Sequence, residues 1–187
     1  MKLPWIIVFF VFTLTTTAQT ITNFTLLDVV SGDSVSLKQY TNRKGVALIF
    51  TSNQCAFDTY YTERIKKWVN TYSDQIQFLL INASQEPGEA TAAMNQTIAQ
   101  RKINVPYLAD KSQVAFTLLG AKKTPEVFLL KPTAGKFMVF YAGALDDNPQ
   151  VATDVKQDYL KNNIDKLLAG QPSDENVRAV GCSVRRR

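Results

Sequence analysis

The residues with the most evident chemical potential are Cys55 and Cys182, the two cysteines of a 187-residue chain. Cys55 follows an apolar run, Gly45–Phe50, and precedes a segment with helical periodicity. A thiol at a strand-to-helix turn lies near a helix N-terminus, where backbone N–H groups and the helix dipole stabilise the thiolate. We therefore expect Cys55 to be a redox-active thiol, half of a structural disulfide, or both.

The absence of histidine limits what these cysteines can do. The chain has no histidine, which excludes Cys-His dyads, Ser-His-Asp triads and histidine metal sites. Two cysteines alone make a poor zinc or iron–sulfur site, so we expect no metal and no other cofactor. Any thiol chemistry must then be tuned by the helix, by hydrogen bonds, or by lysine and arginine side chains.

The N-terminal segment has the pattern of a secretory signal peptide. A basic start is followed by an apolar run of 12 residues, Leu3–Leu14, shorter than the roughly 20 that span a bilayer as a helix. Small residues follow, so we predict that residues 1–18 are removed after Ala18 and that no stable membrane span remains. An uncleaved N-terminal anchor is the alternative. Export predicts a periplasmic or secreted protein, in an oxidising compartment that permits a disulfide.

The mature chain, residues 19–187, has the length of one domain with a sizeable core. The formal charge is +5 for the full chain, and Arg185–Arg187 contribute three of these charges. The folded body is therefore close to neutral, which argues against a nucleic-acid-binding surface.

The hydrophobic pattern predicts an α/β sandwich, with a central mixed sheet and helices on both faces. Runs that are apolar throughout predict strands buried on both sides, and the stripe from Phe57 to Tyr72 predicts an amphipathic helix. The expected elements are a hairpin (24–30 and 34–37), a strand (46–50), a helix (56–72), a strand (75–81), a helix (89–101), an extended link (105–110), a short helix (111–119), a second hairpin (126–131 and 136–141), a last helix (158–169) and a partly irregular tail (about 171–187).

This order resembles the thioredoxin fold, with a cysteine at the first strand-to-helix turn and Thr124-Pro125 at the start of a late strand. More closely, the chain resembles the peroxiredoxin-related redoxins of the alkyl hydroperoxide reductase and thiol-specific antioxidant type. The matching segments span nearly the whole mature chain in the family's order: Phe50–Cys55, Val105–Asp110, Thr124–Leu129, Gly143–Asn148 and Ala179–Ser183. The resemblance implies a thioredoxin-like three-layer sandwich, a cis Pro125 beside Cys55, and an active-site loop with Asn53, Gln54, Asp58, Thr124 and Pro125.

The resemblance also implies an activity, that of an exported thiol oxidoreductase. Cys55 would be the nucleophile, with the Ser52 hydroxyl in the place of the peroxiredoxin threonine. Cys182 would resolve a sulfenic acid or a mixed disulfide on Cys55. The implied partners are a hydroperoxide or a protein disulfide as substrate and an external thiol as reductant.

The chain departs from these families at several positions. Asp58 stands where a Cys-x-x-Cys motif has its second cysteine, Ala56 replaces a common proline, and Leu48 replaces a peroxiredoxin proline. The sequence does not place the arginine that polarises peroxide in peroxiredoxins, and Arg64 and Arg101 are candidates without support from spacing. We expect Asp58 to stabilise the helix start by roughly 0.3–1 kcal/mol, and it would also oppose a nearby thiolate.

A second function fits the same residues. The chain would be a non-catalytic thioredoxin-fold binding or structural module in which a Cys55–Cys182 disulfide closes a long loop and stabilises the fold by roughly 4–5 kcal/mol. Two unpaired thiols are a third possibility. Asp146-Asp147-Asn148 resembles a fragment of a calcium loop, but it lacks the further oxygen ligands, so we expect a turn there.

Overall fold

The computed structural model of the protein describes residues 19–186. The predicted signal peptide, residues 1–18, lies outside these described residues. Within residues 19–186, no helix is both long and apolar enough to cross a membrane.

The centre of the molecule is an eight-stranded mixed sheet with the order β1-β9-β8-β4-β5-β6-β2-β3. Strand β4 pairs in parallel with β5 and antiparallel with β8, and β5 pairs in parallel with β6. The remaining pairs are antiparallel. The strands are β1 (Thr20–Ile21), β2 (Thr25–Asp28), β3 (Ser34–Ser36), β4 (Gly45–Phe50), β5 (Ile76–Asn82), β6 (Tyr107–Ala109), β8 (Glu126–Thr133) and β9 (Lys136–Gly143).

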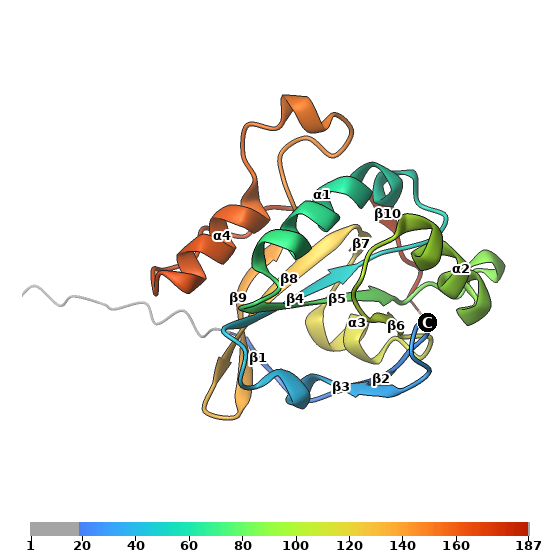
Figure 1. Cartoon of the computed structure of the whole chain (residues 1–187), viewed down its shortest axis with the longest axis horizontal. Helices are drawn as coiled ribbons and strands as arrows, with labels where there is room; N and C mark the ends of the chain where they lie inside the picture. The colour runs from blue at the N-terminus through green and yellow to red at the C-terminus, as the bar shows by residue number, and fades with distance from the viewer. Residues whose placement is uncertain (1–18, 187) are drawn as a thin grey trace, which may run out of the picture.

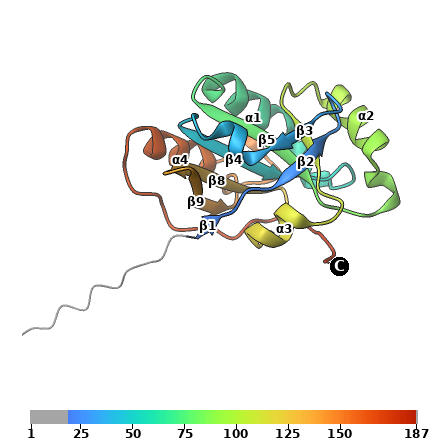
Figure 2. The same cartoon turned by 90° about the horizontal axis from the view of Figure 1, so that it is seen from below.

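Helices cover both faces of this sheet. Figures 1 and 2 show α1 and α4 on one side of the central strands and α3 on the other. The helices are α1 (Ala56–Tyr72), α2 (Thr91–Arg101), α3 (Val114–Leu119) and α4 (Tyr159–Leu168), with the 3-10 turns η1 (Leu37–Tyr40), η2 (Pro87–Glu89) and η3 (Ala152–Asp154). The predicted three-layer α/β sandwich is confirmed.

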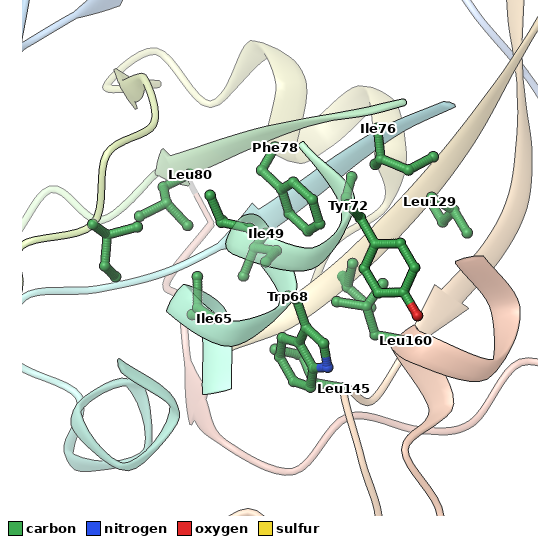
Figure 3. Close-up of a cluster of buried hydrophobic side chains, with 14 of the residues drawn as sticks. Ile49, Ile65, Trp68, Tyr72, Ile76, Phe78, Leu80, Leu129, Leu145 and Leu160 are labelled. Carbon is green, nitrogen blue, oxygen red and sulfur yellow. The ribbon is translucent and has the colours of Figure 1, made fainter. Parts of the chain in front are cut away.

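Strand β4 separates two hydrophobic cores. Its side chains alternate, so Ala47 and Ile49 belong to the core under α1 and α4, while Leu48 and Phe50 belong to the core that includes α3. Figure 3 shows the first core, in which Trp68 from α1 packs over the sheet near Ile49. Fully burying a side chain such as Leu48, Ile49 or Phe50 contributes about 1.5–3 kcal/mol. Strand β4 is therefore held by packing on both of its faces up to its last residue.

Two segments are more regular than the sequence indicated. The predicted extended link contains β6, a three-residue strand in which Tyr107 N–H donates to Asp28 Oδ1 at 3.0 Å. The tail contains a second short strand, β10 (Cys182–Ser183), which pairs antiparallel with β7 (Lys123–Thr124) outside the main sheet. Such short strands lack a readable alternation, and their partners fix them instead.

Candidate redox site

A disulfide joins Cys55 to Cys182, with Cα atoms 5.9 Å apart and a sequence separation of 127. Cys55 is the N-cap residue of α1, directly after the loop that leaves β4. Its side chain is buried, with a relative exposure of 3 %. Cys182 lies in β10 and is partly exposed. The structure therefore brings together the two cysteines whose pairing the sequence left open.

The tail reaches Cys55 along β7. Cys182 lies opposite Thr124 in the antiparallel pair, and Figure 1 shows β10 beside β7 near the start of α1. The Thr124-Pro125 bond is cis, as the resemblance implied, and Pro125 is buried. The Thr124 carbonyl oxygen lies 3.2 Å from Cys55 Sγ, so it would accept a hydrogen bond from the reduced thiol. The segment before Pro125 thus contacts both halves of the disulfide.

Gly181 lets the tail approach this closely. A Cβ atom at position 181 would lie 2.2 Å from the carbonyl oxygen of Thr124, a distance that real Cβ contacts do not show. The oxygen belongs to the backbone, so it has little freedom to move aside. Any larger residue at 181 would therefore force β10 away from β7.

The loop before Cys55 is held by a buried carboxylate, Glu89, at the end of η2. Ser52 Oγ donates to Glu89 Oε1 at 2.5 Å, Asn53 N–H donates to Oε2 at 2.9 Å, and Gln54 N–H donates to Oε1 at 3.1 Å. Asn82 Nδ2 donates to Oε2 at 2.7 Å. Glu89 is 1 % exposed, so these donors replace the water that its charge would otherwise need.

Asn53 is fixed by its side chain as well. Asn53 Nδ2 donates to the Gly88 carbonyl at 3.1 Å, and the Tyr107 hydroxyl donates to Asn53 Oδ1 at 3.0 Å. The Gln54 side chain, by contrast, is exposed. Of the predicted loop residues, Ser52 and Asn53 therefore serve the internal network, and Gln54 contributes its backbone.

Asp58 differs from the prediction. It lies in the first turn of α1, but it is 1 % exposed and accepts a hydrogen bond from Ser52 N–H at 3.1 Å instead of capping the helix. Burial raises its pKa to about 7, and the Thr51 side chain, the Arg101 charge, the Ser52 N–H and the Thr124 side chain lower it by less. Its Oδ1 makes no hydrogen bond of ordinary geometry within the described residues, which fits a desolvated acid. Burial thus outweighs the expected dipole stabilisation.

The two candidate arginines lie in different places. Arg101 belongs to the site: it donates to Thr51 Oγ1 at 3.1 Å and to the Ser52 carbonyl at 3.0 Å. Arg64 instead binds Asp146 and donates to the Asn148 carbonyl at 2.8 Å. Arg101 holds the backbone of the loop, and Arg64 fixes the segment that follows β9.

That segment is a turn, as predicted. Asn148 N–H donates to Asp146 Oδ1 at 3.1 Å, a local contact typical of such turns. The Tyr61 hydroxyl donates to the same oxygen at 2.6 Å, so Asp146 also ties the turn to α1.

Sequence reasoning missed Glu89 and gave Arg101 only as one of two guesses. Glu89 was expected as the first residue of the helix over 89–101, whereas α2 begins at Thr91 and Glu89 closes the preceding 3-10 turn. Its contact with Ser52 spans 37 positions. No local pattern marks such a contact.

A model of the AhpC/TSA family matches residues 17–156 of this chain. The chain belongs to the AhpC/TSA family. The matched region includes Cys55 and Thr124-Pro125, and Cys182 lies beyond it. A search of curated proteins finds no match.

Solved structures share the fold of this chain. A hypothetical protein from Sinorhizobium meliloti 1021 is 25% identical, with a TM-score of 0.81 over 92% of this chain and 95% of that one. An uncharacterized conserved protein from Geobacillus kaustophilus is 23% identical, with a TM-score of 0.82 over 94% of each chain. A putative thiol:disulfide interchange protein DsbE from Chlorobium tepidum is 20% identical, with a TM-score of 0.63 over 82% of this chain and 98% of that one. This AhpC/TSA chain therefore has a thioredoxin-like fold.

Proposed function

We propose that this AhpC/TSA member is an exported thiol oxidoreductase that exchanges thiols and disulfides through the Cys55–Cys182 pair. The observation that carries the proposal is the disulfide itself, formed at the N-terminus of α1 beside Thr124-Pro125. Thioredoxin-like redoxins act on peroxide or disulfide substrates with an external reductant, and this pair supplies the two sulfurs that such a cycle needs. Export, to the periplasm or the outside of the cell, rests on the sequence of residues 1–18.

In the proposed cycle the reduced chain attacks first through Cys55. The Cys55 thiolate bonds to one sulfur of a substrate disulfide, and the other substrate sulfur leaves as a thiolate. Cys182 then attacks Cys55, which releases the second substrate thiol and forms the intramolecular disulfide. The substrate gains two electrons, and two external thiols, or one dithiol, supply two electrons that reduce the Cys55–Cys182 disulfide again.

The buried hydrogen bond of the Ser52 hydroxyl to Glu89 favours disulfide exchange over hydroperoxide reduction as the activity of this site. The Ser52 hydroxyl, expected in the place of the peroxiredoxin threonine, donates to Glu89 and is buried. Arg101 contacts Thr51 and the Ser52 backbone. The donors suited to polarise a peroxide therefore have partners already.

The second candidate, a structural module closed by this disulfide, is favoured by the anchoring of the tail. Ala144 N–H donates to the Val177 carbonyl at 2.8 Å, before Cys182. Gln113 Nε2 donates to the Arg185 carbonyl at 2.6 Å, after it. Contacts on both sides would keep Cys182 in place even without chemistry.

Reduction of insulin disulfides by dithiothreitol, followed by turbidity, separates the two functions. We expect wild type to accelerate the reaction and Cys55→Ser to give only the uncatalysed rate, because the nucleophile is lost. Pre-reduced Cys182→Ser mixed with insulin after removal of dithiothreitol should retain the first exchange and stop at a mixed disulfide on Cys55, visible by mass spectrometry. Wild type no faster than Cys55→Ser would refute the enzymatic function and leave the structural one. Hydroperoxide consumption by the same proteins should stay near the Cys55→Ser level.

A further inference from the structure

The end of the chain that carries Cys182 is strongly basic. Residues 176–187 contain four arginines and no aspartate or glutamate, whereas the preceding stretch, residues 146–175, contains seven acidic residues and three lysines. The charge of the chain therefore changes sign just before the tail reaches Cys55. We propose that this basic tail, together with β7, selects a reductant of the Cys55–Cys182 disulfide in which acidic side chains flank the reactive thiol. The inference rests on the proposed function and names the charge of its reductant.

Strand pairing places two lysines of the β7 region beside the basic tail. Ser183 lies opposite Lys123, whose Nζ donates to Ser183 Oγ at 2.9 Å, and Val184 N–H donates to the Lys122 carbonyl at 3.4 Å. Arg178 lines the same surface groove as both lysines. We call these five cations the basic rim: Lys122, Lys123, Arg178, Arg185 and Arg186. Lys123 is half-buried and the other four are exposed, so their charges act on molecules that approach β10.

The carboxylates near the basic rim do not cancel its charge. Glu126 Oε2 accepts hydrogen bonds from the backbone N–H groups of the two rim lysines, at 2.6 and 2.9 Å. Glu86 lies 3.9 Å from Arg185. Asp146, which lies beside the tail, is buried and paired with Arg64. Two carboxylates therefore oppose the five cations, and the rim keeps a net positive charge.

A positive rim around a disulfide favours anionic thiols when the two molecules meet. Thiolates are the attacking species in disulfide exchange, and complementary charge raises association rates by about 10- to 1,000-fold. Each exposed charge pair contributes little by itself, so a partner gains most when several acidic side chains face several cations of the rim. Because the rim surrounds a disulfide, the ligand that it selects must also bring a thiol. An acidic peptide or protein thiol meets both conditions.

The exchange balances for such a partner. One partner thiolate bonds to one sulfur of the disulfide, the Sγ–Sγ bond breaks, and its electron pair leaves on the other sulfur, which takes a proton from water. A second partner thiolate then attacks the partner sulfur of the mixed disulfide and releases the remaining thiolate of the chain, which also takes a proton. The partner loses two electrons and forms its own disulfide, and the Cys55–Cys182 pair gains both electrons. Charge selection operates for attack on either sulfur.

The test compares two peptides of equal length with a single cysteine, one flanked by glutamates and the other by lysines. Oxidised wild-type protein is mixed with each peptide, quenched with acid and alkylated, and the loss of the Cys55–Cys182 disulfide is followed by mass spectrometry. Flanking charges also change the pKa of the peptide thiol. Each rate is therefore divided by the rate at which the same peptide reduces hydroxyethyl disulfide, which is small and uncharged.

The corrected rates give the charge preference of the protein. At low salt we expect the glutamate peptide to react at least about tenfold faster than the lysine peptide. At about 1 M salt the two corrected rates should become nearly equal, because the Debye length is then only about 3 Å. Equal corrected rates at low salt, a faster lysine peptide, or a preference that salt does not reduce overturns the inference.

A matched pair of double variants tests whether the basic rim causes the preference. Lys122→Gln with Arg178→Gln removes two exposed cations of the rim, and the low-salt preference should fall by about threefold or more. Lys38→Gln with Lys67→Gln removes the same charge from exposed positions before β4 and in the second half of α1, and should keep the wild-type preference. Circular dichroism checks that both proteins are folded. A rim variant that loses no more of the preference than this control contradicts the inference.

The same rates separate the inference from the proposed function. Native protein that both peptides reduce at equal corrected rates refutes only the inference. If neither peptide reduces the native protein and both reduce it in guanidinium, the disulfide is structural, and the proposed function fails together with the inference.

Discussion

The two cysteines of one disulfide lie in very different surroundings. The loop before Cys55 is tied down by hydrogen bonds from Ser52, Asn53 and Gln54 to the buried Glu89. Cys182 sits in a two-residue strand that pairs with one short neighbour and has exposed residues on either side. One sulfur is part of the core of the protein, and the other belongs to a segment laid over its surface.

This difference shows how one bond can serve both stability and chemistry. A disulfide closes a loop equally well whichever side is buried, because the loop entropy depends on the number of residues enclosed. Reactivity depends instead on the more accessible sulfur and on the better leaving group. Cys55 lies in the core and Cys182 nearer the surface, so under the proposed function the two sulfurs would differ in these roles.

The largest test of the comparison removes the bond between the two regions. Cys182→Ser should lower the free energy of unfolding by about 5 kcal/mol, because the disulfide encloses a loop with a sequence separation of 127. Urea unfolding measured by circular dichroism gives this value. Wild type in excess reductant is the control and should match the variant closely. A loss below about 1 kcal/mol would show that the disulfide adds little constraint to the unfolded chain.

A second test acts on the buried side alone, through Asp58. Its pKa is about 7 in the folded protein, raised from the ordinary 3.8 by desolvation. Between these values the unfolded chain has already released the proton that the folded chain still holds. The contribution of protonated Asp58 to the free energy of unfolding therefore falls as the pH rises from about 4 to 7, and it is lost above pH 7.

Asp58→Asn should remove this pH dependence. The raised pKa corresponds to at most about 4 kcal/mol. The stability of the variant relative to wild type should therefore rise by up to that amount from pH 4 to pH 8. Unfolding at both pH values measures it. Asp147→Asn is the matched control, because Asp147 is exposed and the pKa of its carboxyl is lowered, chiefly by the Gln157 N–H. If the stability of Asp58→Asn relative to wild type rose no more than that of Asp147→Asn, the claim that Asp58 is buried as a neutral acid would be contradicted.

The sequence was sufficient wherever a long periodic pattern decided the structure. The apolar run that forms β4 and the stripe that forms α1 predicted both elements and placed Cys55 between them. The short helix predicted over 111–119 ends at Leu119 as expected, and Gly120 adopts the left-handed conformation directly after it. These features depend on local patterns, which a sequence displays directly.

What escaped prediction depends on contacts between distant segments. Asp58 has the sequence of an exposed first-turn acid, but Thr124 and Arg101 approach it from other parts of the chain. The three residues of β6 carry too short a pattern to be recognised as a strand. The pairing of Cys182 with Cys55 was expected for a redox pair and for a structural disulfide, but two unpaired thiols stayed open, because spacing cannot tell where a tail folds back.

Glu89 is the sharpest case of such a distant contact, and it carries the smallest of the three predicted effects. Glu89→Ala leaves the Ser52 hydroxyl and the Asn53 N–H without their acceptor, and the Gln54 N–H keeps only its second acceptor, Ser52 Oγ. The free energy of unfolding should fall by about 3 kcal/mol, since each unsatisfied buried donor costs about 1–3 kcal/mol. Amide hydrogen exchange at positions 53 and 54 should accelerate as well, which a general loss of stability would not confine to this loop.

Two further variants sharpen the Glu89 prediction. Glu89→Gln keeps an acceptor oxygen and should recover part of the lost stability, while its amide group meets donors that it cannot satisfy. Glu86→Ala, three residues earlier and exposed, should change stability by less than about 0.5 kcal/mol. If Glu89→Ala changed stability and amide exchange no more than Glu86→Ala does, the loop before Cys55 would be no more rigid than the tail. The contrast between the two sides of the disulfide would then rest on solvent access alone.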